Sequence, residues 1–165
     1  MKERITKILT INGGSSSIKF ALFNSSNSLT ELLYGELKNI GSENSIFSFN
    51  NIATGEKNSI PVKTSTHTEA STVLIDFLNE QNSYATLIAI GHRIVHGMQH
   101  TEPEVITPEL LDELKKISAY DPEHLTEEIK LIELFNQHYP AVKQVACFDT
   151  AFHTCEYPCR NICGE

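Results

Sequence analysis

The chain has 165 residues, 40% hydrophobic and 21% charged, so it is long enough to bury the core of one domain, and its composition excludes a disordered or fibrous protein. Its formal net charge of −8, with 13 scattered basic residues, excludes a nucleic-acid-binding surface, which needs clustered lysine and arginine. No apolar run reaches the ~18 residues of a membrane span, and Met1–Lys7 lacks the apolar stretch of a secretion signal. We therefore expect no membrane contact and a cytoplasmic location.

The first sixty residues alternate between apolar and polar positions, which is the period of half-buried strands. Polar turn residues at 24–27 and 51–56 separate neighbouring segments. This pattern predicts a meander of antiparallel strands. Its five members are Lys7–Asn12, Ser17–Asn24, Leu29–Leu37, Ser45–Asn50 and Lys57–Val62.

The rest of the chain reads as helices that alternate with buried strands. Apolar residues recur at helical spacing between Thr68 and Glu80, and Thr107 followed by Pro108 is typical of a helix start. The predicted elements are a helix at 68–80, a strand at Leu87–Arg93, a helix from Thr107, a helix from Asp121 that ends before Tyr139, and a strand at Val142–Phe148.

Between the first two predicted strands lies the turn Gly13-Gly14-Ser15-Ser16-Ser17, with Lys19 shortly after it. Glycines let backbone N–H groups approach an anion closely, serines add hydroxyl donors, and the lysine adds a positive charge. The turn is not a Walker A loop, because that spacing is absent and the following segment alternates like a strand. The pattern alone leaves two readings open, a phosphate cradle and an ordinary hairpin turn.

Three segments of the chain resemble, in order and with similar spacing, the motifs of the acetate kinase family. They are Ile11–Phe20, Gly91–Gly97 (Gly-His-Arg-Ile-Val-His-Gly) and Phe148–His153 (Phe-Asp-Thr-Ala-Phe-His). The resemblance runs from Ile8 to His153. Within it the chain departs from the family at Gly13, where the family has alanine, and at Met98, where it has glycine.

This resemblance implies an α/β fold, a mixed sheet with helices, of the ribonuclease-H-like type found in the superfamily of acetate and sugar kinases, Hsp70 and actin. In that architecture ATP binds in a cleft between two such lobes. Family members are more than twice as long as this chain, so we interpret residues 1–153 as the N-terminal lobe, 154–165 as a divergent C-terminal tail, and the second lobe as absent. The abrupt change of character in the tail suggests a truncated or frameshifted reading frame.

The activity that the resemblance implies is acetate kinase, which transfers the γ-phosphoryl group of ATP to acetate directly and in line, with ATP and Mg²⁺ as cofactors. By resemblance, Arg93 binds the acetate carboxylate and the transferring phosphoryl group, to which its planar fork is suited. Asp149 acts at the catalytic centre and toward Mg²⁺, which prefers carboxylate and water oxygens. Both residues are therefore expected to be catalytic.

The remaining site residues also follow from the resemblance. Asn12 corresponds to the asparagine at the family's metal and phosphate site. The expected phosphate-binding residues are Ser15, Ser17 and Lys19, and the expected substrate-binding residues besides Arg93 are Val95 and His124.

Structural alternatives stand beside these roles. Arg93 at a strand end could pair with a surface carboxylate, and Asp149 could cap a turn or helix. Histidines inside the motifs could belong to the core, whereas those outside them are expected at the surface; the first group is His92, His96 and His153, and the second is His67, His100 and His138. Cys155, Cys159 and Cys163 lack the spacing of a zinc site and are expected to be free thiols.

Three functions remain open at this point. The first is an acetate kinase fragment that is inactive alone, because further charge-stabilising residues of the family have no counterpart here. The second is a non-enzymatic binding lobe, and the third is one half of a split kinase. The expected partners are acetate and ATP, with a second copy of the chain or a separately encoded second lobe as protein partner. The sequence does not distinguish acetate from propionate or butyrate as acceptor.

Overall fold

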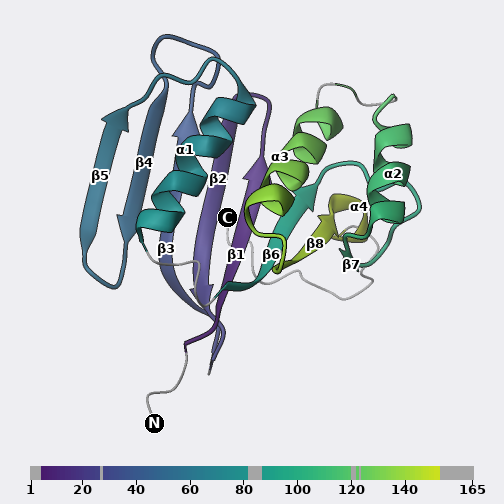
Figure 1. The fold of residues 1–165 in the computed structure, drawn as a ribbon, viewed down its shortest axis with the longest axis horizontal. Helices are drawn as coiled ribbons and strands as arrows, with labels where there is room; N and C mark the ends of the chain where they lie inside the picture. Colours follow the sequence, from purple (N-terminus) through teal and green to yellow (C-terminus); the bar gives the residue numbers. More distant parts are fainter. Residues whose placement is uncertain (1–4, 27, 82–86, 120–121, 123, 153–165) are drawn as a thin grey trace, which may run out of the picture.

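The computed structural model describes residues 5–26, 28–81, 87–119, 122 and 124–152. They form a mixed eight-stranded sheet with helices (Figure 1), in the strand order β5-β4-β3-β2-β1-β6-β8-β7. The strands are β1 (Lys7–Gly13), β2 (Ser17–Asn24), β3 (Thr30–Lys38), β4 (Ile46–Asn51), β5 (Glu56–Pro61), β6 (Leu87–Ile94), β7 (Glu104–Val105) and β8 (Lys143–Phe148). The helices are α1 (His67–Glu80), α2 (Pro108–Ile117), α3 (Leu125–His138) and the short α4 (Asp149–Phe152).

The sheet has an antiparallel half and a parallel half. Strands β1 to β5 pair antiparallel with their neighbours in sequence, which confirms the predicted meander. Strand β6 then pairs parallel with β1, and β8 pairs parallel with β6. The carboxyl ends of β1, β6 and β8 consequently meet at one edge of the sheet, as expected for parallel strands.

Helices α1 and α3 cover the same face of the sheet (Figure 1). Alternate residues of the central strands point to that face and are buried, including Leu9, Ile18 and Ile90, each with no exposed surface. One core cluster joins α1 and α3 to the meander, and a second joins α2 and α3 to β6 and β8. The opposite face presents Thr10, Lys19 and Arg93 and other residues that are more exposed, so the described elements bury one face of the sheet far better than the other.

Three elements differ from the sequence prediction. Helix α3 begins at Leu125, later than predicted, and Pro122 and His124 before it lie in a turn. The two-residue strand β7 and the single-turn helix α4 are too short to leave a periodic signal. None of the helices in the described ranges has the length and apolar character that a membrane span requires.

Candidate functional site

Three polar side chains from separate parts of the sequence meet at the carboxyl edge of the parallel strands. Arg93 Nε donates to Asp149 Oδ1 at 2.9 Å, and its NH2 group donates to Asp149 Oδ2 at 2.6 Å. The remaining NH1 group donates to Asn12 Oδ1 at 3.2 Å. The structure thus brings together the two predicted catalytic residues and the predicted metal-binding asparagine.

The strand geometry explains this convergence. Asn12 lies near the end of β1, Arg93 lies near the end of β6, and Asp149 directly follows β8. Because β1, β6 and β8 are parallel neighbours, their ends lie side by side. In open α/β sheets this edge is where ligands bind.

The Arg93–Asp149 pair is accessible to a ligand, since the two side chains are 47% and 32% exposed. The hydrogen bonds that Arg93 donates to Asp149 are the largest cause that raises the pKa of Arg93 above its ordinary value, and the nearby charges of Asp149 and Glu128 add to this. Arg93 is therefore a permanent cation with a bidentate geometry suited to carboxylates and phosphates. Solvent screening limits what a pair as exposed as this contributes to the stability of the fold.

A second cation lies beside this cluster. Lys19 is the cross-strand partner of Asn12, so both side chains project from the same face of the sheet. The Lys19 side chain is 61% exposed, and its ammonium group lies 3.9 Å from Glu36, which has a closer partner in Lys38 at 3.0 Å. Lys19, Asn12 and Arg93 line one open groove of about 300 Å³, whose other lining residues include Thr10, Gly91 and Cys147.

The glycine–serine turn closes the tight connection between β1 and β2 at the same edge. Gly14 N–H donates to the carbonyl of Ser17 at 2.8 Å, and the carbonyl of Ser16 accepts from Ile40 N–H at 3.0 Å. Within the described residues, the N–H groups of Ser15 and Ser16 donate to no other protein atom. The segment is therefore a hairpin turn, which was one of the two interpretations of the sequence. The N–H groups of Ser15 and Ser16 are also available to an anion.

The two predicted substrate-binding residues lie near the site but outside this cluster of hydrogen bonds. Val95 N–H donates to the carboxylate of Glu128, at 3.3 and 3.4 Å from its two oxygens. His124 directly precedes α3 and makes no side-chain capping bond to it. Since Glu128 belongs to the first turn of α3, that turn is hydrogen-bonded to the residue directly after β6. The role of both residues in binding substrate stays a prediction.

The side-chain oxygens of Asn12 and Asp149 fit a magnesium ion whose remaining coordination positions are filled by phosphate and water. Asn12 and Asp149 offer an amide oxygen and a carboxylate at the same edge, and both are held by Arg93. Mg²⁺ commonly takes one or two carboxylates and fills its other positions with water and substrate phosphates. Among the described residues no three His, Cys, Asp or Glu side chains form a metal-binding group, so the fit depends on a bound phosphate.

Sequence reasoning missed three polar residues around this site. His67 and His100 were expected at the surface, and this is wrong, because each side chain is only 15% exposed. Glu128 is 3% exposed, and no periodic signal distinguishes it from the polar residues beside it in α3. His92, by contrast, is a core histidine as one alternative held, and His138 is exposed as expected. His153 and the three tail cysteines lie outside the described residues.

Solved structures similar to this one are kinases of short carboxylic acids. The propionate kinase of Francisella tularensis subsp. tularensis SCHU S4 matches with a TM-score of 0.80 and 35% identity, over 90% of this chain and 38% of that one. The acetate kinase of Porphyromonas gingivalis matches with a TM-score of 0.78 and 29% identity, over 89% and 38%. The fold is therefore the mixed α/β, ribonuclease-H-like lobe of the acetate and propionate kinases, as predicted.

Sequence relatives narrow this class to one family. The acetate kinase of Borrelia hermsii is 40% identical over 157 residues, or 89% of this chain and 37% of the relative. The propionate kinase of Escherichia coli O6:H1 is 37% identical over 147 residues, or 88% and 35%. The family model of the acetokinases matches residues 7–159, so the chain belongs to the acetokinase family. It spans about 38% of the length of the curated relatives it matches.

Proposed function

We propose that this chain provides the carboxylate- and phosphoryl-binding part of an acetate kinase site, in which ATP and acetate give ADP and acetyl phosphate. The observation that carries the proposal is the guanidinium of Arg93, bonded at once to Asp149 and Asn12. Membership of the acetokinase family, whose members include acetate and propionate kinases, supports the reaction class.

In the proposed reaction an acetate oxygen attacks the γ-phosphorus of ATP, and the bond from that phosphorus to the β–γ bridging oxygen breaks as ADP leaves. Such a transfer asks the protein for positioning and charge neutralisation rather than covalent chemistry. Arg93 binds acetate and the moving phosphoryl group, while Asp149 holds the guanidinium in a fixed plane. Its NH1 group does not contact Asp149 and donates to Asn12.

The other side chains have matching roles in the proposal. The free N–H groups of Ser15 and Ser16, the hydroxyls of Ser15 and Ser17, and the ammonium of Lys19 hold phosphate oxygens. Asn12 and Asp149 would hold the magnesium ion, which when bound neutralises charge on the phosphate oxygens. Val95 and His124 belong to the acceptor pocket, whose size decides between acetate and propionate.

Titration of the ¹⁵N-labelled chain with acetyl phosphate tests the proposal. We expect the amide signals of Gly14 to Ser17 and the Nε–H signal of Arg93 to shift. Arg93→Ala should weaken binding about 10- to 100-fold, since a hydrogen bond to a charged group contributes ~1.5–3 kcal/mol. Lys143→Ala removes an exposed cation of β8 outside this cluster and should leave the affinity unchanged. Equal affinity in both variants, or shifts confined to other parts of the chain, contradicts the proposal.

A further inference from the structure

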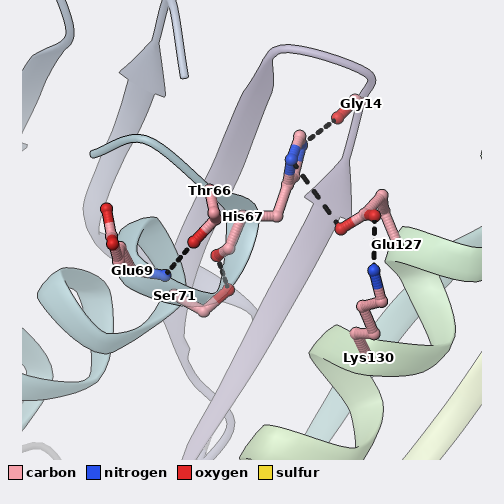
Figure 2. A network of polar contacts seen from close by, with 7 residues as sticks. All are labelled: Gly14, Thr66, His67, Glu69, Ser71, Glu127 and Lys130. Atoms are coloured by element: carbon pink, nitrogen blue, oxygen red, sulfur yellow. Dashed lines mark hydrogen bonds and ion pairs between the residues drawn. The ribbon is translucent and has the colours of Figure 1, made fainter. Parts of the chain in front are cut away.

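His67 is a partly buried side chain that the proposed mechanism does not use. It is the first residue of α1, and the helix start around it is well defined, because the side chain of Thr66 accepts from Glu69 N–H. The hydroxyl of Ser71 in turn donates to the carbonyl of His67 at 2.7 Å. The imidazole therefore projects from a fixed point toward the glycine–serine turn (Figure 2).

The ring contacts two other segments of the chain. Nε2 lies 2.8 Å from the carbonyl oxygen of Gly14, and since that oxygen can only accept, Nε2 carries the proton. On its other side, Nδ1 lies 3.8 Å from Glu127 Oε2, and the second carboxylate oxygen accepts from Lys130 Nζ at 2.8 Å. His67 thus hydrogen-bonds to the glycine–serine turn and lies beside the first turn of α3, as Figure 2 shows.

The contact with Gly14 sets the direction of a donor. The peptide bond between Gly14 and Ser15 is planar and trans, as no cis peptide is present in the described residues, so its C=O and N–H point opposite ways. With the carbonyl held toward α1 by His67, the N–H of Ser15 points away from α1. This is one of the two N–H groups in the turn without a protein acceptor among the described residues.

The same turn of α3 also reaches the arginine strand. Glu127 faces His67, while its neighbour Glu128 accepts from Val95 N–H, two residues beyond Arg93 in sequence. Two consecutive carboxylates of one helical turn therefore lie beside His67 and at the end of β6.

We propose that His67 is a positioning residue, which fixes the Gly14–Ser15 peptide so that the Ser15 N–H faces the ligand. The phosphate nature of that ligand rests on the proposed function. The positioning itself is a property of the free chain and can be measured without a ligand.

The test compares His67→Gln with His67→Asn by NMR. The side-chain nitrogen of glutamine reaches about as far as imidazole Nε2, whereas that of asparagine reaches only as far as Nδ1, which does not contact Gly14. The two readouts are the N–H residual dipolar coupling of Ser15, which reports the orientation of that peptide in the folded state, and hydrogen exchange of the Gly14 amide. His138→Asn, at an exposed position, is the matched control.

We expect His67→Asn to change the Ser15 coupling and to speed Gly14 exchange about fivefold, as loss of one hydrogen bond would. His67→Gln should keep both values close to those of the unsubstituted chain. If the two variants behave alike, or if neither differs from His138→Asn, His67 does not position the turn. These measurements use no phosphate, so their result does not depend on the proposed function. The proposed function has its own test, because it is contradicted if the unsubstituted chain does not bind acetyl phosphate.

Discussion

Two consecutive side chains of β6 illustrate how one strand serves both the core and the site. His92 points to the helix-covered face, where it is 2% exposed and its Nε2 lies 2.6 Å from Gln144 Oε1. Arg93 points to the open face and contacts Asp149 and Asn12. Successive residues of a strand alternate in this way. Adjacent residues of one motif therefore have different roles: the buried His92 belongs to the core, and the exposed Arg93 belongs to the site.

Burial of His92 makes the stability of the chain depend on pH. Desolvation lowers the pKa of His92 from 6.5 to about 4, against a smaller opposing effect of the hydrogen bond with Gln144. The unfolded chain thus binds a proton between about pH 6.5 and 4 that the folded chain does not bind. Neutral His92 therefore contributes ~3 kcal/mol to the free energy of unfolding. This contribution is complete above pH 6.5 and is lost as the pH falls toward 4.

We expect His92→Gln to flatten this dependence. Glutamine cannot titrate, yet its amide can still donate to Gln144. The free energy of unfolding in urea at pH 7.5 and at pH 5 should therefore fall less in His92→Gln than in the unsubstituted chain. His138→Gln, which changes an exposed histidine, should retain the full decrease. Identical decreases in all three chains would mean that His92 is not kept neutral by burial.

At the scale of elements, the segment that follows β6 packs directly against the end of β8. A Cβ atom at Gly97 would stand 2.5 Å from Phe148 Cδ1, and Phe148 is only 2% exposed. The next residue is Asp149, so the close approach at Gly97 helps to place the carboxylate beside Arg93. A glycine at this point of the second motif therefore has a packing reason.

Gly97→Ala should lower the free energy of unfolding by ~1–3 kcal/mol, since overpacking forces core side chains to move. It should also weaken acetyl phosphate binding, because any shift of Phe148 moves Asp149. The matched variant is Gly91→Ala, where an added Cβ would meet Cys147 Sγ at an ordinary 3.9 Å. Urea unfolding of both variants measures the difference. Equal stability of the two would show that the contact with Phe148 is relieved without cost.

The elements that sequence analysis predicted are those with a long periodic signal. Strands β1 and β2 alternate over seven and eight residues, and α1 has an apolar face of four turns, so their period identifies them. Strand β7 has two residues, and its pairing with β8 depends on the tertiary fold. The start of α3 was misplaced because Asp121-Pro122-Glu123 resembles a helix start as well as the segment at Thr107 does.

The residues of the candidate site also fall into those that the sequence predicted and those that only the structure shows. Arg93, Asp149 and Asn12 were predicted from motifs, and the structure brings them together as parallel strand ends. His67 could not be predicted, because its partner Gly14 lies 53 positions away and nothing near it in sequence distinguishes it from an exposed histidine. The division of the chain at residue 153 stays a prediction, since 153–165 lie outside the described residues.

At the scale of the whole molecule, the site residues lie where the parallel strands β1, β6 and β8 end, on the less buried face of the sheet. The chain spans about 38% of the length of its relatives, so the proposed reaction is best tested with the remaining part of a relative present. The polypeptide of 165 residues, tested alone with ATP, Mg²⁺ and acetate, is expected to form little or no acetyl phosphate. Turnover at the rate of a full-length acetate kinase would contradict that expectation.

The most direct test of the central claim uses a chimera in which residues 7–152 replace the matching segment of the acetate kinase of Borrelia hermsii, which is 40% identical to this chain. The acetyl phosphate that the chimera forms is trapped and measured as the hydroxamate. Acetate and propionate are compared as acceptors. We predict a chimera that forms the acyl phosphate and loses about 100- to 1000-fold of its rate with Arg93→Ala, as expected when one preorganised charge stabiliser is removed. A folded chimera that binds ATP but forms no acyl phosphate, or one whose rate is unaffected by Arg93→Ala, would contradict the claim that these residues form a phosphoryl-transfer site.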